Sequence, residues 1–388
     1  MASAAERFVL LGLRLGRLED GLVDSYCGPE DLARQVETEL LSDPAALAAD
    51  ADALLGDLED GWLRDQVQGL RTYAGVLAGE ELSYSDEVER CYGVRPERVS
   101  TDVYAEAHER LAALVPGAGS LAERYAEWRR SLAVPRDRIA PVLRDVTEVL
   151  RERTRALVEL PEGEDLEIGP VEDEPWWAFN HYRGGLRSRV EVNVDLPASA
   201  GDLVEIAAHE AYPGHHTERA VKEQRLIREA GMLEESIQLV PTPASLIAEG
   251  IAEVGPAVVM DDDLVGRLEA ALRRHGLTED LKRARAVREA RRPLRRVLLD
   301  AALLLHEDGG SPEDARAYLE RWALTSPEEA AHGVRFLFDP NSRAYAITYS
   351  AGDELCRAWV DGDSHRFARL LGEPIRVRDL LAGVSSGS

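Results

Sequence analysis

The chain has 388 residues, of which 45% are apolar and 30% are charged. This balance is that of a globular protein, and it excludes a disordered chain, a collagen and a coiled-coil rod. The 72 acidic residues outnumber the 46 basic ones and give a formal net charge of −26. Because such a surface repels phosphate backbones, we expect no nucleic-acid partner.

Cysteine usage and hydropathy predict the compartment. The three cysteines are Cys27, Cys91 and Cys356. They are scattered and odd in number, so they indicate neither a disulfide framework nor a cysteine metal site, and they fit a reducing cytoplasm. No run reaches the roughly 18 uninterrupted apolar residues of a membrane span, and the apolar run at 8–13 is broken by Arg14. We therefore expect a cytoplasmic protein without a membrane partner.

Most of the chain predicts amphipathic helices. Leu, Val and Ala recur three and four residues apart with Arg, Glu and Asp between them, a pattern typical of helices with one buried face. The pattern covers 33–55, 101–114, 134–160 and 263–306. We predict a mainly α protein in three parts that form one integrated fold. These are an N-terminal helical half (1–160), an acidic loop with a β-ribbon (161–199) and a helical, metal-binding half (200–388).

The middle part differs from the rest of the chain. Residues 161–175 contain three prolines and seven acids, which predicts a solvated loop. Residues 188–194 alternate apolar and polar side chains over a β-branched run, which is typical of a half-buried strand. We predict a small β-ribbon near 176–196. An extended peptide could add to the exposed edge of the strand 188–194 through main-chain hydrogen bonds, and the alternative is a purely structural ribbon that covers helices.

A helix predicted to begin near Asp202 leads into the segment that carries the chemistry. This segment reads His209-Glu210-Ala211-Tyr212-Pro213-Gly214-His215-His216, and it holds three of the nine histidines of the chain. Imidazole is the commonest metal ligand in proteins. A His-Glu pair on a helix is also how zinc peptidases place a ligand beside a general base. The segment therefore predicts a catalytic metal site.

The spacing of these histidines differs from the usual H-E-x-x-H. The fourth residue after His209 is Pro213, which cannot bind a metal and has no N–H for the helix. His215 and His216 lie six and seven residues after His209, a distance over which an ideal helix rises by about 10 Å. Pro213-Gly214 must therefore distort the helix if His209 shares a metal with either histidine. The spacing leaves open which of the two binds.

A carboxylate ligand is available later in the chain. Thr242 and Pro243 favour the start of a helix in which Glu249 lies in a mostly apolar stretch, where an unpaired carboxylate is costly. Gly250 would let another backbone or a substrate approach closely. Glu253 lies one turn later on the same face and could orient a histidine.

These residues predict the ligands of one zinc ion, with Mn²⁺ or Co²⁺ also compatible with nitrogen and oxygen donors. The candidate ligands are His209, His215, His216 and Glu249. Zinc lowers the pKa of a bound water toward about 7, so Glu210 is the predicted base that takes its proton.

The octapeptide resembles the H-E-x-x-P-G-H-H signature of the bacterial domain-of-unknown-function family numbered 885. Its members are regarded as zinc metallopeptidases whose helical fold is similar to carboxypeptidase Taq and related gluzincins. In that family a strand ending in V-N precedes the signature, and Val192-Asn193 matches it. The later E-G-W-A element is matched by Glu249-Gly250-Ile251-Ala252 except at tryptophan. A late Q-A-x-x-Y-x-x-G element is matched by Ala346, Tyr349 and Gly352, with Tyr345 in the place of glutamine.

The resemblance covers the second half of the chain, and it implies a gluzincin-like fold with a central cleft. It also implies a metallopeptidase that cleaves a peptide or small amide, with carboxypeptidase action. The candidate substrate-binding residues are Asn193, Arg343 and Tyr345, of which Arg343 could bind a carboxylate through its guanidinium fork. Tyr349 has two interpretations, a hydrogen-bond donor to the developing oxyanion or an ordinary core residue.

Two other functions stay open. One is a metal-dependent hydrolase or lyase of a non-peptide small molecule, and the other is a non-catalytic binding protein stabilised by metal. Residues 282–296 hold eight basic residues. We interpret them first as a solvated helix face that pairs with the protein's acids, next as a binding group for a substrate carboxylate, and last as a nucleic-acid patch.

Overall fold

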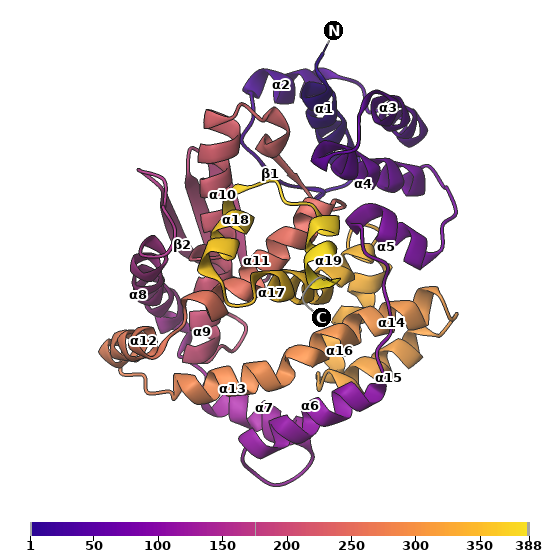
Figure 1. Ribbon diagram of the computed structural model, residues 1–388. Helices are drawn as coiled ribbons and strands as arrows, with labels where there is room; N and C mark the ends of the chain where they lie inside the picture. The colour runs from indigo at the N-terminus through magenta and orange to yellow at the C-terminus, as the bar shows by residue number, and fades with distance from the viewer. Residues whose placement is uncertain (1, 175, 386–388) are drawn as a thin grey trace.

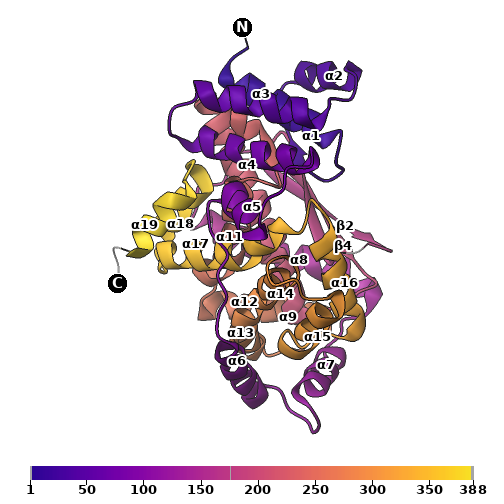
Figure 2. The same cartoon turned by 90° about the vertical axis from the view of Figure 1, so that its right-hand side faces the viewer.

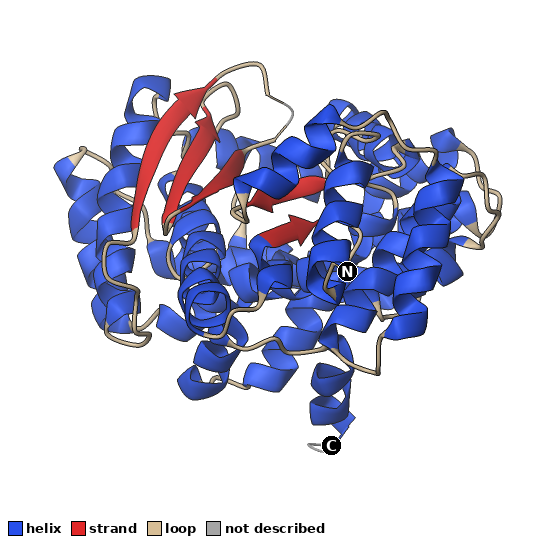
Figure 3. Cartoon of the chain, turned by 90° about the horizontal axis from the view of Figure 1, so that it is seen from above, coloured by secondary structure: helices blue, strands red, loops and turns tan. Residues whose placement is uncertain are grey.

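The computed structural model describes residues 2–174 and 176–385. Within them the chain is mainly helical, as predicted, with a two-stranded and a three-stranded sheet among the helices (Figures 1 and 3). No single helix of the described chain is both long and apolar enough to cross a membrane. The adjoining helices α11 (Pro243–Val259) and α12 (Asp262–Arg274) meet these criteria only as a pair, and a bend of 97° separates them.

The N-terminal helices are α1 (Ala4–Gly16), α2 (Glu30–Thr38), α3 (Pro44–Asp57), α4 (Trp62–Leu77), α5 (Tyr84–Tyr92), α6 (Thr101–Leu114), α7 (Leu121–Ser131) and α8 (Arg136–Arg155). Five of these eight helices, α1, α3, α5, α6 and α7, begin at a Ser or Asp cap. The side chains of Ser100 and Ser120 accept hydrogen bonds from first-turn N–H groups of α6 and α7. The helical pattern over 33–55 is divided into two helices, because Asp43 caps a new helix with Pro44 in its first turn.

The C-terminal helices include two short π-helical turns that matter for the site. They are α9 (Ala200–Ile206), η1 (Ala207–Ala211), α10 (His215–Lys222), α11 (Pro243–Val259), α12 (Asp262–Arg274), α13 (Leu281–Arg291), α14 (Arg296–His306), α15 (Pro312–Trp322), α16 (Pro327–Phe338), η6 (Thr348–Gly352), α17 (Asp353–Val360), α18 (Ser364–Gly372) and α19 (Val377–Ser385). The pattern over 263–306 is likewise divided, with turns after α12 and α13.

The larger sheet contains the predicted ribbon. Strands β3 (Ala178–Gly184) and β4 (Arg187–Asn193) form an antiparallel hairpin, and β2 (Asp165–Val171) pairs with β4 in parallel. The predicted loop over 161–175 is therefore wrong for β2, whose Leu166 and Ile168 pack on the core while the exposed Glu167 lies between them. Because β4 is the central strand, it has no free edge to which a peptide could add. The smaller sheet pairs β1 (Val23–Tyr26) with β5 (Ile237–Leu239).

Helix α11 runs through the middle of the molecule (Figure 1). Its apolar side chains enter two buried clusters: Leu246 and Ile251 belong to the one built with α14 and α17, and Val259 to the one built with α8 and η1. A Cβ atom at Gly250 would collide with the carbonyl oxygen of Gly352 and with the Cys356 sulfur. The glycine thus lets η6 lie directly on α11, as expected for Gly250, and brings the tyrosines before and within η6 toward Glu249.

Candidate metal centre

The Pro-Gly pair breaks the helix at the predicted place. Helix α9 continues into η1, where the Tyr212 N–H donates to the Ala207 carbonyl over 3.1 Å, and the Gly214 N–H then donates to the Ala208 carbonyl over 3.0 Å. A Cβ atom at Gly214 would collide with the His209 carbonyl oxygen. Only glycine therefore lets the backbone at position 214 pass so close to the backbone of His209. Helix α10 starts directly afterwards at His215, which faces back toward His209.

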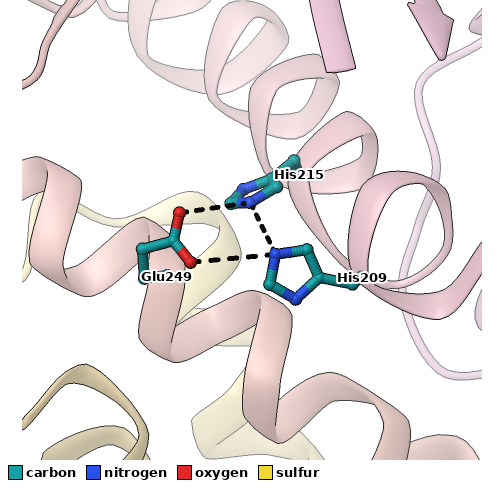
Figure 4. Close-up of side chains that lie close together, drawn as sticks. All are labelled: His209, His215 and Glu249. Carbon is teal, nitrogen blue, oxygen red and sulfur yellow. Dashed lines mark hydrogen bonds and ion pairs between the residues drawn. The ribbon is translucent and has the colours of Figure 1, made fainter. Parts of the chain in front are cut away.

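Three side chains converge from η1, α10 and α11 (Figure 4). The Nε2 atoms of His209 and His215 are 3.2 Å apart, and they lie 3.7 and 3.6 Å from the two carboxylate oxygens of Glu249. Donors of a tetrahedral zinc site with bonds of about 2.0–2.1 Å are separated by roughly 3.4 Å. The observed separations therefore fit one ion held by two imidazoles and one carboxylate, the donor set of several catalytic zinc sites.

Two features of these donors point to a cation. Burial, together with the charges of nearby His215, Arg288 and Arg295, lowers the pKa of His209 well below its usual value, so this imidazole is the neutral form that binds metals. The Oε2 atom of Glu249 is buried without a hydrogen-bond partner among the described residues. A divalent ion would satisfy this oxygen and both facing nitrogens at once.

Further side chains hold the three donors in place. The Tyr345 hydroxyl donates a 2.7 Å hydrogen bond to Oε1 of Glu249. Glu253 has one oxygen 3.6 Å from Nδ1 of His209, as expected for a residue that orients a histidine, and its other oxygen lies 2.9 Å from Arg288 and 2.5 Å from Arg295. Such partners fix ring orientation and ligand basicity. Tyr345 thus holds Glu249, and Glu253 lies against the ring of His209.

Glu210 follows His209 in η1, as a base beside a ligand should. Burial, helped by the charges of Glu249 and Asp24 and opposed by His215, raises the pKa of Glu210 to about 7. The Asn180 amide on β3 donates a 2.6 Å hydrogen bond to the Glu210 carbonyl and so ties this turn to the sheet.

His216 is not placed as a ligand, and this corrects the prediction that allowed either histidine. Its Nδ1 atom is 2.8 Å from the Ser188 hydroxyl and its Nε2 atom 3.1 Å from Glu164, in a fully buried position. Successive residues of a helix point about 100° apart, so His215 and His216 cannot face the same centre. The structure thus selects His215, and His216 links α10 to the sheet.

Two predicted substrate-binding residues have structural partners instead. The Asn193 amide donates to the carbonyls of Glu174 and Trp176 over 2.7 and 3.1 Å, so it holds these two residues, which lie between β2 and β3. The Arg343 guanidinium pairs with the buried Glu87, with one contact of 3.1 Å. Neither side chain is free for a substrate, because both groups already have hydrogen-bond partners within the protein.

The two late tyrosines lie together beside the ligands. Tyr345, the third predicted substrate-binding residue, supports Glu249 instead. The Tyr349 ring packs against the Tyr345 ring with centroids 5.4 Å apart, and its hydroxyl makes no hydrogen bond within the described chain. Burial and the charges of Glu249 and Glu210 raise the pKa of Tyr349, so its hydroxyl stays protonated near them. Both interpretations of Tyr349 stay open.

Sequence reasoning missed Asp24, Asn180 and Glu164. Asp24 lies exposed on β1, which runs beside β3, and its charge raises the pKa of both Glu210 and Glu249. Glu164, counted above among solvated acids, is buried and contacts His216, Tyr212 and Arg151. No local pattern marks these residues, because strand pairing and packing between distant segments bring them to the site.

Comparisons with known proteins address the fold alone. No family model and no curated protein matches the chain. A proposed lipoprotein from Colwellia psychrerythraea matches over 92% of this chain with 17% identity and a TM-score of 0.50, and this chain spans 59% of its length. A proposed lipoprotein of unknown function from Shewanella oneidensis matches over 97% of this chain and 72% of its own, with 15% identity and a TM-score of 0.51.

Proposed function

We propose that the protein is a zinc-dependent hydrolase, most simply a metallopeptidase that cleaves an amide bond in a peptide or small amide. One observation carries the proposal: donor atoms of His209, His215 and Glu249 lie within 4.8 Å of one another, with Glu210 next in sequence to the first. A structural zinc site is closed by four protein ligands, whereas a catalytic site keeps a position open. Three protein donors that keep some solvent exposure favour the catalytic kind.

Each residue then has a defined part in hydrolysis. A zinc ion held by the three donors would lower the pKa of a bound water and polarise the scissile carbonyl. Glu210 takes the proton of the attacking water and passes it to the leaving amine. Tyr349 offers its protonated hydroxyl to the developing oxyanion, and Tyr345 and Glu253 keep Glu249 and His209 in position. The resemblance of the octapeptide to the metallopeptidase signature adds support from the sequence.

Charge near the donors favours a substrate with an amino group close to the scissile bond. Arg343, the residue expected to bind a substrate carboxylate, is already paired with Glu87. Asp24 makes no ion pair among the described residues, and its carboxylate is close enough to affect Glu210 and Glu249. An unpaired carboxylate at this position attracts an ammonium group. The proposal therefore prefers peptides with a free amino group to N-acetylated ones, and carboxypeptidase action rests on the resemblance alone.

The test is hydrolysis of a fluorogenic peptide mixture by wild type and by Glu210→Gln, with bound metal measured in both. We expect Glu210→Gln to keep its metal and to lose roughly 100-fold or more in kcat, the usual contribution of a general base. Glu97→Gln is the matched control, since the Glu97 side chain is exposed and far from the ligands in sequence. Hydrolysis by Glu210→Gln at the wild-type rate would contradict the proposal. A fully metallated wild type that cleaves no amide would favour the binding protein or the non-peptide hydrolase.

A further inference from the structure

A cavity that none of the proposed metal ligands lines has Arg288 and Arg295, the partners of Glu253, in its wall. It has a volume of about 330 Å³ and lies between α7, α9, α13 and the turn that follows α13. Figures 1 and 2 show α13 at the end of the molecule that also carries α6 and α7. A volume of this size suits a small molecule and excludes a polymer.

The cavity is unusually basic for so acidic a chain. Its lining includes two carboxylates, Asp202 and Glu205, and five arginines. These arginines are Arg285, Arg288, Arg291, Arg292 and Arg295. They come from successive turns of α13 and from the turn after it, so one face of this segment is directed at the cavity. Five of the eight residues of the basic run noted in the sequence thus line a cavity, while Lys282 and Arg283 are exposed. The expected pairing with acids is seen at Lys282 and Arg296 and at several of the cavity arginines.

The arginines divide into two groups. Arg288, Arg292 and Arg295 form ion pairs with acids of the protein, among them Glu253 and Asp353. Arg285 and Arg291 form no ion pair among the described residues. The Arg291 guanidinium lies 4.5 Å from the centre of the Tyr125 ring, and its Nε atom is buried without a hydrogen-bond partner. Two positive charges are thus unmatched, and one carries an unused donor.

Apolar side chains complete the lining. Val204, Met260, Leu281 and Leu294 border the same cavity as the arginines. Ligand sites combine apolar walls with a few polar groups that fix orientation. Guanidinium groups bind planar and tetrahedral anions through paired N–H donors. Arg285 and Arg291 therefore suit the carboxylate or phosphate group of a ligand.

We propose that this cavity binds a small organic anion, with a carboxylate or phosphate head group held by Arg285 and Arg291 and an apolar body against the lining. The site is separate from the metal ligands and does not depend on the proposed hydrolase activity. Because the net charge of the chain is −26, binding of anions elsewhere on the surface is disfavoured.

The test is calorimetric titration of the purified protein with phenyl phosphate, benzoate and phenol at physiological salt. We expect saturable binding of at least one anion and none of phenol. The double variant Arg285→Gln/Arg291→Gln should weaken anion binding roughly tenfold or more, since each lost arginine removes charge-assisted hydrogen bonds. The control Lys282→Gln/Arg283→Gln removes the same charge from exposed positions on the same helix and should bind as wild type does.

A third variant separates this cavity from the metal centre, because metal ions also bind anions. His209→Ala should keep anion binding at wild-type strength. Loss of binding in His209→Ala, equal loss in both arginine and control variants, or no binding of either anion by wild type would each overturn the proposal. Thermal unfolding of every variant shows that a loss of binding is not a loss of fold.

Discussion

The Tyr345 hydroxyl donates a 2.7 Å hydrogen bond to the carboxylate of Glu249, across 96 positions of sequence. Residues that hold a metal ligand typically contribute 10- to 100-fold to metal affinity. We expect Tyr345→Phe to weaken zinc binding about tenfold, as measured by competition with a chromophoric chelator. Tyr349→Phe is the control, since that hydroxyl has no such bond, and it should leave zinc affinity unchanged. Equal affinities in Tyr345→Phe and wild type would show that this hydrogen bond does not support the ligand.

Gly250 allows α11 and η6 to touch, and a methyl group there should separate them. We expect Gly250→Ala to lower the free energy of unfolding by roughly 1–3 kcal/mol, the usual cost of overpacking. Gly266→Ala is a matched control on exposed α12, where an added Cβ meets nothing within 4 Å. It should raise the free energy of unfolding by about 0.5–1 kcal/mol. Urea unfolding measures both, and a Gly250→Ala protein as stable as wild type would refute the tight contact.

His216 should matter for stability and not for metal. Its removal takes the hydrogen bond from the buried Ser188 hydroxyl and one of several from the buried Glu164, so we expect His216→Ala to lower the free energy of unfolding by roughly 2–4 kcal/mol. His332→Ala, an exposed histidine without recorded side-chain partners in the described chain, should have no effect. The same urea experiment compares them. A His216→Ala protein with wild-type stability would mean that this buried network contributes nothing.

Glu164 predicts a pH dependence of stability. Burial raises the pKa of Glu164, but hydrogen bonds from His216, Tyr212 and Arg151 outweigh burial and set it at about 2. Because the folded pKa lies below the unfolded value of about 4.3, the carboxylate stabilises the fold above that value and less as the pH falls toward 2.

Urea unfolding of metal-free wild type and Glu164→Gln between pH 6 and pH 3 tests this dependence. Wild type should lose more stability across that range than the variant, which has no carboxyl group to protonate. Parallel pH profiles would show that Glu164 does not titrate with folding.

Much of the candidate site follows from the sequence because its chemistry is local. The His-Glu pair, the Pro-Gly break and the adjacent histidines are contiguous, and the apolar surroundings of Glu249 mark a carboxylate that needs a partner. The choice of His215 over His216 depends on how α10 is rotated, which Gly214 and the packing of His216 against the sheet decide. No sequence motif shows the rotation of α10 or the packing of His216 against the sheet.

The rest of the site depends on pairing between distant segments. The sequence predicts a loop in the place of β2 because the acids of this strand hide the alternation of Leu166 and Ile168, and its parallel partner β4 comes later in the chain. Asp24 reaches the site only through the pairing of β1 with β5. The sequence predicts substrate contacts at Arg343 and Asn193 because it does not show that these side chains already bind Glu87 and two loop carbonyls.

The central claim is that His209, His215 and Glu249 hold one divalent metal ion. The most direct measurement is elemental analysis of purified wild type, His215→Ala and His216→Ala after exchange into zinc-containing and then zinc-free buffer. The account predicts one metal ion per chain in wild type and in His216→Ala, and none in His215→Ala. Metal retained by His215→Ala, or lost equally from both variants while both remain folded, would contradict it.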